Sequence, residues 1–243
     1  MTDSGRRGVD STRRRFLAAA GATTAALVAG CSDGSGDDGA DATPGDGGGE
    51  TNTPGTPTPY GEELSPPVRG DADADVTLAV FEDYACPHCA DYNVEGFPEL
   101  QEAYVSTGEV RYEHRDLPIP VANPGSFQAA NAARAVQHRQ GDEAFWPYSD
   151  AVFERSRDIS SDGPELFASL AESQGHDPAE IREAAQYRVY RATVERDRQR
   201  AIDLGAEATP TFAVDGEIVA SGFGSGTVGT LRDELDAALS ETG

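Results

Sequence analysis

The stretch FEDYACPHCADY, residues 81–92, constrains the fold of this chain more than any other part of the sequence. It contains two cysteines, Cys86 and Cys89, with two residues between them. The pair follows a run of β-branched and aromatic residues and precedes a segment with helical periodicity. A cysteine pair with this spacing carries out thiol chemistry, holds a metal, or closes a small structural loop. The neighbouring elements and the rest of the chain help to decide between these three interpretations.

The segments on either side of the pair predict a β-α-β unit. Residues 75–84, DVTLAVFEDY, have the composition of a strand. We expect a helix that begins at or near Cys86, ends before Gly108 and is kinked at Pro98. Residues 109–118, EVRYEHRDLP, then alternate as a half-buried strand does. The helical spacing is carried by Val94, Phe97, Leu100 and Tyr104.

The C-terminal part predicts a hairpin followed by a helix. TPTFAVDGEIVASG contains two strand-like runs around Asp215-Gly216, a dipeptide that favours a tight turn. The last segment repeats apolar residues on one helical face, at Leu231, Leu235, Ala238 and Leu239. Between about residues 120 and 205 the pattern is helical throughout, and we expect Trp146 and Tyr148 there to be packing residues.

Three features at the N-terminus predict export and a lipid anchor. The basic residues 13–15 precede a weakly apolar run that is too short and too mild to span a bilayer comfortably. TRRRFL resembles a twin-arginine signal, and VAGC resembles a lipobox whose cysteine, Cys31, becomes lipidated. We expect a signal peptide over 1–30, a disordered acidic tether over 31–66 and the folded domain over 67–243. The cysteine pair then works outside the cell membrane, in an oxidising compartment.

The charge of the chain limits its partners. The formal net charge is −24, and all 19 basic residues are arginines. Such a surface repels itself in dilute buffer but is screened in molar salt, where the Debye length is about 3 Å. The composition resembles that of proteins from extreme halophiles. It argues against nucleic-acid binding, which needs a basic face.

The order of these motifs resembles the DsbA-like branch of the thioredoxin superfamily. A β-α-β opening with CPHC, a long helical stretch and Thr209-Pro210 before a hairpin and a helix carry the likeness, which covers about residues 75–239. It implies an α/β, thioredoxin-like fold with a helical insertion at about 120–205 and no cofactor. It also implies a cis bond at Pro210 beside the cysteines, where the backbone of Thr209 hydrogen-bonds a substrate peptide.

Thiol chemistry assigns a different role to each residue of CPHC. A thiolate at a helix N-terminus is stabilised by the helix dipole and by free N–H groups, so we expect Cys86 to be the attacking sulfur. Cys89, one turn further on, is expected to be buried, to have an ordinary pKa and to resolve the mixed disulfide. Pro87 fixes the backbone between the two cysteines. His88 is predicted to direct a hydrogen bond or a positive charge toward the Cys86 sulfur.

The sequence is less compatible with a structural disulfide, a zinc site or a haem attachment site at the cysteine pair. A structural disulfide closing so small a loop removes little entropy from the unfolded chain. A zinc site needs about four ligands, whereas His114, His138 and His176 are scattered without finger spacing. Covalent haem attachment requires a histidine directly after the second cysteine, and that residue is Ala90.

One position departs from the resemblance. Many relatives carry a buried acid on the strand six residues before the first cysteine, where it helps to move the proton of the resolving thiol. Here that residue is Val80. Glu82, Asp83 or a water molecule are candidates to replace it, unless both acids only decorate the loop.

The sequence thus predicts an extracytoplasmic thiol-disulfide oxidoreductase, anchored to the membrane through a lipid on Cys31. The predicted substrates are cysteine-containing exported proteins, to which this protein donates disulfides. We expect it to act as a monomer and to exchange electrons with a membrane redox partner. Two alternatives stay open. One is a disulfide reductase or isomerase, and the other is a non-catalytic thioredoxin-fold lipoprotein that binds a metal or a partner.

Overall fold

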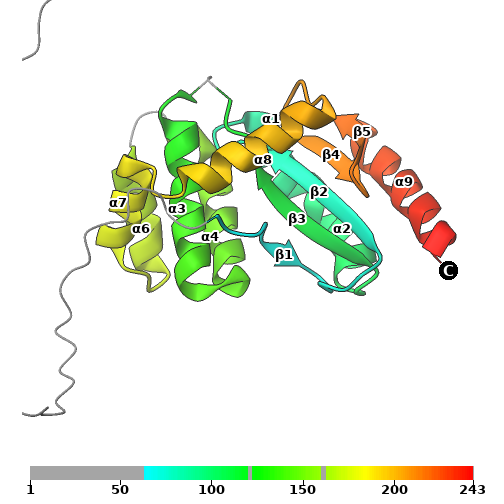
Figure 1. The fold of residues 1–243 in the computed structure, drawn as a ribbon, viewed down its shortest axis with the longest axis horizontal. Helices are drawn as coiled ribbons and strands as arrows, with labels where there is room; N and C mark the ends of the chain where they lie inside the picture. Colours follow the sequence, from blue (N-terminus) through cyan, green and yellow to red (C-terminus); the bar gives the residue numbers. More distant parts are fainter. Residues whose placement is uncertain (1–62, 120–121, 160–162, 243) are drawn as a thin grey trace, which may run out of the picture. The chain divides into compact units, whose positions relative to one another are not determined.

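The structure is a computed structural model that describes residues 63–119, 122–159 and 163–242. The predicted signal peptide, Cys31 and nearly all of the predicted tether therefore lie outside the described residues. Within the described part, the strands form a five-stranded sheet in the order β1-β3-β2-β4-β5 (Figure 1). Strands β2 and β3 are parallel, and the other neighbours are antiparallel. This is the α/β architecture that the resemblance implies.

The predicted strands are present. They are β2 (Val76–Glu82), β3 (Val110–Asp116), β4 (Thr211–Val214) and β5 (Glu217–Ser221), and a two-residue strand β1 (Val68–Arg69) completes the sheet. The turn between β4 and β5 has positive φ at Asp215 and Gly216, 47° and 87°, as a tight hairpin turn requires. Across the parallel pair, Val80 lies opposite His114 and Glu82 lies opposite Asp116.

The predicted helix after the cysteine motif has the expected extent but is not α-helical throughout. It consists of α1 (Pro87–Asp91), η1 (Tyr92–Gly96), α2 (Phe97–Leu100) and η2 (Gln101–Val105). Both η segments are π-helical, and they flank the α-helical turn that contains Pro98. Proline has no N–H to donate to the carbonyl one turn earlier, as an α-helix requires. The α-helical hydrogen-bond pattern is therefore interrupted around Pro98, where the sequence predicts a kink.

The helical insertion and the last helix agree with the periodicity of the sequence. The insertion contains α3 (Gly125–Gln140), α4 (Asp142–Glu154), the short 3₁₀ turn η4 (Ser156–Asp158), α6 (Pro164–Ser173), α7 (Pro178–Tyr187) and α8 (Arg191–Leu204), and α9 (Thr227–Thr242) follows the hairpin. The Asp177 side chain caps α7 by accepting from the N–H groups of Ala179 and Glu180. Gly205, with φ 89°, ends α8.

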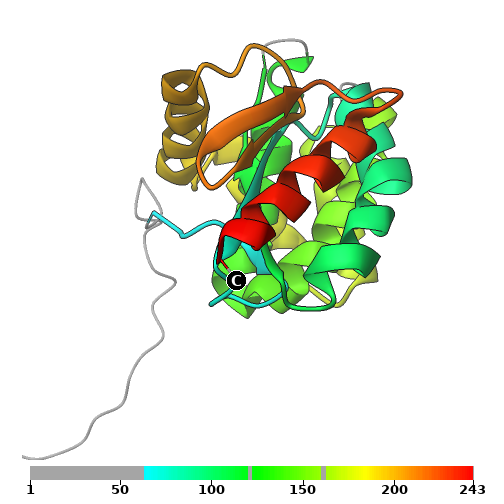
Figure 2. The same ribbon diagram turned by 90° about the vertical axis from the view of Figure 1, so that its right-hand side faces the viewer.

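Alternation along β2 divides its side chains between two layers. Val76, Leu78 and Val80 are fully buried on one face, which the α1–α2 stretch and α9 cover. Phe81 faces the other side, where Ala201 and Leu204 of α8 cover it. Figure 2 shows α9 running beside the helix that follows the cysteines. Figure 1 shows α3, α4, α6 and α7 grouped at one end of the sheet.

The domain begins slightly earlier than the sequence predicts. The predicted tether extends to residue 66, but Leu64 packs against the core and its N–H donates to Thr193 Oγ1 at 2.9 Å. The carbonyl of Ser65 accepts hydrogen bonds from Gln137 and Arg134. These contacts are long-range, and local composition does not reveal them.

Candidate active site

The two cysteines lie where β2 leads into α1, as free thiols. Cys86 is the N-cap residue of α1, with an extended backbone, and its carbonyl accepts from the N–H groups of Cys89 and Ala90, both at 3.1 Å. Its own N–H donates to the carbonyl of Asp83 at 2.9 Å. This turn holds the Cys86 sulfur over the first free N–H groups of the helix.

Cys86 is only slightly accessible, and its surroundings favour the thiolate. The residue is 7% exposed, and its Sγ lies 3.5 Å from the carbonyl oxygen of Thr209. A hydrogen bond from the Cys89 thiol, helped by the N–H groups of Cys89 and His88, outweighs burial and lowers the pKa of Cys86 to about 5. At neutral pH this sulfur is therefore an anion and a nucleophile.

Cys89 has the opposite environment. It is fully buried, and burial, its hydrogen bond to Cys86 and the negative charge of Glu82 raise its pKa well above the usual value. It is therefore the thiol of the pair that keeps its proton at neutral pH. The sequence predicts an ordinary pKa at this position, and the difference comes from complete desolvation next to an acid.

The two residues between the cysteines both face solvent. Pro87 occupies the first position of α1, where its missing N–H costs nothing, and its side chain is exposed. The imidazole of His88 is also exposed and makes no hydrogen bond among the described residues. What His88 contributes to the thiolate is its backbone N–H. The predicted role of the His88 side chain stays a prediction.

The Thr209–Pro210 segment lies beside the cysteines. The peptide bond between these residues is cis, as the resemblance implies, and the Thr209 side chain is 5% exposed. Thr209 precedes β4, which pairs with β2 and so brings the two segments together from opposite ends of the chain. The Thr209 carbonyl is the backbone group of this segment that contacts the Cys86 sulfur.

Glu82 and Asp83 do not decorate a loop, because both are almost completely buried. Asp83 accepts from the N–H groups of Ala85 and Ile119, both at 2.8 Å, and burial raises its pKa to about 6. These two hydrogen bonds connect the loop before Cys86 to the loop after β3.

Glu82 lies two residues after Val80 and therefore on the same face of β2. Its Oε1 accepts from Asn93 Nδ2 at 2.7 Å, and the same amide group donates to the carbonyl of Cys89 at 2.9 Å. Burial raises the pKa of Glu82 against the hydrogen bonds of His114 and Asn93. A buried acid is therefore present beside Cys89, although not at the position where the resemblance places one.

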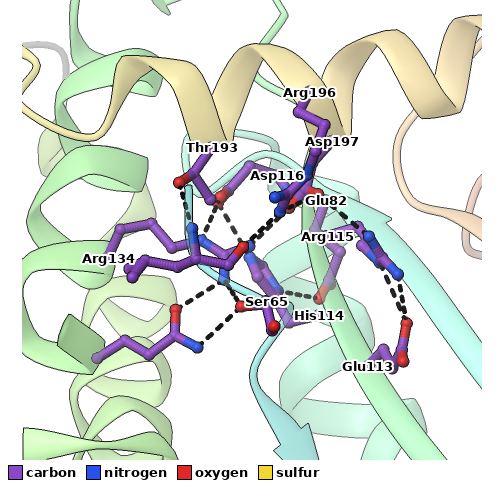
Figure 3. A network of polar contacts seen from close by, with 12 residues as sticks. Ser65, Glu82, Glu113, His114, Arg115, Asp116, Arg134, Thr193, Arg196 and Asp197 are labelled. Atoms are coloured by element: carbon purple, nitrogen blue, oxygen red, sulfur yellow. Dashed lines mark hydrogen bonds and ion pairs between the residues drawn. The ribbon is translucent and has the colours of Figure 1, made fainter. Parts of the chain in front are cut away.

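A chain of buried polar groups leads away from Glu82 (Figure 3). Glu82 Oε2 lies 3.3 Å from Nδ1 of His114, and Nε2 of His114 lies 3.3 Å from Oδ1 of Asp116. Asp116 pairs with Arg134 at 2.6 Å, and Arg134 pairs with Asp197 at 2.7 Å. All five side chains are at most 1% exposed.

The sequence indicates only part of this network. One signal is present: Glu82 continues the alternation of Leu78 and Val80, and His114 and Asp116 continue that of Tyr112. Strands that extend to these positions place both acids and the histidine on inward faces. Arg134 and Asp197 carry no such signal: Asp197 lies in a helix among other polar residues, and Arg134 lies in an alanine-rich helix whose sequence does not show which residue pairs with it.

A dithiol at the first strand-to-helix junction, beside a cis-proline segment, defines a thioredoxin-fold redox site. A family model described as thioredoxin matches residues 62–231. The chain belongs to this family, in its DsbA-like branch of thiol-disulfide oxidoreductases.

The relatives agree with this assignment. Disulfide bond formation protein D of Bacillus subtilis is 29% identical over 156 residues, which are 63% of this chain and 69% of that protein. The oxidised crystal structure of BdbD from Bacillus subtilis has a TM-score of 0.64 at 26% identity, covering 72% of this chain and 93% of its own. The DsbA structure from Chlamydia trachomatis has a TM-score of 0.58 and covers 78% of this chain and 97% of its own. At 22% identity this last likeness shows the fold alone.

Helix length and polarity bear on membrane insertion. In the part of the chain that the structure describes, no helix combines the length and the apolar character that crossing a membrane requires.

Proposed function

We propose that this chain donates disulfides to cysteine-containing exported proteins through the CPHC motif, with Cys86 as the exchanging sulfur and Cys89 as the resolving one. The observation that carries the proposal is the surroundings of Cys86, which lower its pKa to about 5 beside a partner thiol that stays protonated. A stabilised thiolate makes the reduced form more stable, so the disulfide form becomes a stronger oxidant. This favours donation over reductase or isomerase activity.

The reaction then has two exchange steps. A substrate thiolate attacks Cys86 Sγ, the Cys86–Cys89 bond breaks, and Cys89 leaves with the electron pair and takes up a proton. A second substrate thiolate attacks the substrate sulfur of the mixed disulfide, and Cys86 leaves as a stable thiolate. Two electrons pass from the substrate dithiol to the cysteine pair. Glu82, the buried acid beside Cys89, supplies the proton that Cys89 needs.

The substrate segment binds beside Thr209 and Pro210. The Thr209 backbone already reaches the Cys86 sulfur, so a peptide laid against this segment brings its own cysteine within reach of the disulfide. A membrane redox partner reoxidises the pair after each turnover, and the domain acts as a monomer.

Cysteine variants of the full-length protein test the roles of the two sulfurs. In concentrated salt, Cys89→Ser should accumulate covalent complexes with disulfide-bonded substrate proteins, because the Cys86 thiolate attacks the substrate disulfide and no second thiol resolves the mixed disulfide. Cys86→Ser should accumulate few. Equal trapping by the two variants would contradict the assignment. Titration against glutathione tests the direction, since a reduction potential above about −180 mV supports donation and one below about −240 mV supports reduction.

The location outside the membrane is part of the same proposal. Cys31 lies outside the described residues, and its lipidation is inferred from the sequence VAGC after an export signal. Cys31→Ala should move the protein from the membrane fraction to the soluble fraction and leave thiol exchange unchanged, because the tether separates the anchor from the domain. An unchanged membrane fraction would contradict lipidation at this residue.

A further inference from the structure

His114 lies between two carboxylates on the active-site face of the sheet. Figure 3 shows its ring between Glu82 and Asp116, and each ring nitrogen lies 3.3 Å from one carboxylate oxygen. Nδ1 faces Glu82, which shares the Asn93 amide with the backbone of Cys89. Glu82 and this amide therefore connect the imidazole to the resolving cysteine.

The far side of the imidazole is held by fixed charges. Asp116 accepts from Arg134 Nε at 2.6 Å, and Arg134 Nη2 reaches Asp197 at 2.7 Å. Arg115 joins Asp197 to Glu113 at the edge of the network. Since Arg134 neutralises Asp116, the carboxylate stays ionised and fixes the orientation of the ring.

Aromatic rings exclude water from this part of the network. The His114 ring lies 5.4 Å from the ring of Tyr84 and 5.5 Å from that of Phe145, measured between centroids, and its side chain is 1% exposed. In such a site a charge acts on its neighbour with little screening by solvent. Besides Asp116, the titratable and charged groups around His114 and Glu82 are Cys86, Cys89, Tyr84, Tyr92, Tyr112, Arg134 and Asp197.

We propose that His114 is a positioning residue for the proton that Cys89 exchanges: held by Asp116, its imidazolium stabilises the Glu82 carboxylate each time Glu82 has given its proton to Cys89. The inference rests on the proposed function, because it concerns the leaving and attacking steps of Cys89. It assigns to a histidine on β3 and an acid at position 82 the task that the resemblance gives to a single acid at position 80.

The proton balance of disulfide donation follows from this assignment. The substrate dithiol loses two protons and two electrons in forming its disulfide. Cys89 takes one proton from Glu82, Cys86 stays a thiolate, and Glu82 is later reprotonated from the substrate side through solvent. One proton is released in total. His114 keeps its proton throughout and offsets the charge that appears on Glu82 and disappears again.

The proton affinities of these groups agree with the geometry. Burial alone would lower the pKa of His114, but the hydrogen bonds and charges of Asp116 and Glu82 outweigh it and raise the pKa. Burial likewise opposes ionisation of Asp116, but Arg134 and His114 hold its pKa below the usual range. The surroundings therefore favour the protonated form of His114 next to an acid whose own pKa burial raises.

Two successive reactions with a chromogenic aromatic disulfide separate the two sulfurs in one experiment. The reduced full-length protein, in a Cys31→Ala background and concentrated salt, releases one coloured thiol when Cys86 attacks the reagent. It releases a second when Cys89 gives its proton to Glu82 and attacks the mixed disulfide. We compare the pH dependence of both phases in wild type, His114→Gln and Glu82→Gln, with His138→Gln on the exposed side of α3 as the matched control.

His114→Gln should leave the first phase unchanged. It should move the pH limb of the second phase, the range over which its rate rises with pH, upward by about 1 to 3 units, because the pKa of Glu82 rises without a cation beside it. At a pH below the limb, each unit is a tenfold loss of rate. Glu82→Gln should remove that limb, and His138→Gln should change neither phase. Loss of the first phase in wild type would contradict the proposed function itself. A folded His114→Gln variant with an unmoved second phase would overturn the inference alone.

Circular dichroism establishes whether each variant folds, and a second measurement needs no variant at the site. Nitrogen NMR of the histidines in the wild-type chain reports the protonation of His114. We expect an imidazolium at neutral pH in both the oxidised and the reduced protein, because His114 keeps its proton throughout. A neutral imidazole would overturn the inference.

Discussion

The outer and inner sides of helix α1 stabilise opposite protonation states of two neighbouring thiols. On the outer side, Pro87 and His88 face solvent, and a hydrogen bond from the Cys89 thiol together with the N–H groups of Cys89 and His88 favours a thiolate at Cys86. On the inner side, Cys89 is fully buried and faces the negative charge of Glu82, which disfavours one. Two sulfurs one helical turn apart therefore differ in charge because one lies at the helix start, where donors reach it, and the other lies in the core beside an acid.

The same contrast separates the forces that hold the two sides. The outer side depends on the CPHC turn itself, in which the Cys89 thiol and the N–H groups at the helix start surround the Cys86 sulfur. The inner side depends on a buried set of charges, Glu82, His114, Asp116, Arg134 and Asp197, gathered from β2, β3, α3 and α8. The first is local in the sequence, whereas the second exists only after long-range folding.

The largest expected difference is in the acidity of the two thiols. In a Cys31→Ala background, the ultraviolet absorbance of thiolate should rise once with a midpoint at about 5, for Cys86. It should rise again only well above the ordinary range, for Cys89. The depression at Cys86 corresponds to roughly 5 kcal/mol of differential stabilisation of the thiolate. Two overlapping midpoints would remove the contrast between the two sides of the helix.

A pair of substitutions shows what lowers the pKa of Cys86. Because the hydrogen bond from Cys89 is the largest contribution, Cys89→Ala should raise the pKa of Cys86 more than Cys89→Ser, which keeps a donor. The same absorbance titration measures both. Equal pKa values in the two variants would assign the effect to the backbone N–H groups instead.

The next expected effect is on stability, and it tests the inner side. Arg134→Leu leaves Asp116 and Asp197 buried without their shared partner, and we expect a loss of about 3 to 5 kcal/mol in the free energy of unfolding. Arg139→Leu, on the exposed side of the same helix, removes only the surface pair with Glu180 and should cost about 0 to 1 kcal/mol. Urea unfolding at fixed salt measures both, and equal losses would show that the network does not hold the core.

The helices, strands and turns are well predicted by the sequence because their signals are local. The strand over residues 75–84, the helix that begins at the cysteines and the turn at Asp215-Gly216 each depend on neighbouring residues. Even the interruption of the helix near Pro98 follows from one residue.

The inner side is predicted only in part, for a physical reason. Side-chain alternation is enough to place Glu82 and His114 inward, but whether a buried acid is paired depends on which helix packs against it. Arg134 and Asp197 are 63 residues apart in the chain and meet only because α3 and α8 contact one another. No local pattern contains that information, and the same reason explains why the sequence does not predict the docking of Leu64 and Ser65.

The smallest expected effect concerns the one motif side chain that lies on the outer side without a partner among the described residues, His88. The sequence predicts that its imidazole stabilises the Cys86 thiolate, whereas the contacts give that role to its backbone N–H, which His88→Ala retains. We therefore expect this substitution to raise the pKa of Cys86 by less than about one unit, or about 1.4 kcal/mol, and to lower the reduction potential by less than about 30 mV. Glutathione titration in molar salt, with His138→Ala as control, measures the shift where charges on exposed groups are screened. A fall in potential of more than about 30 mV that persists in salt would mean that the imidazole reaches the sulfur at short range, and the outer side would then depend on the His88 side chain as well.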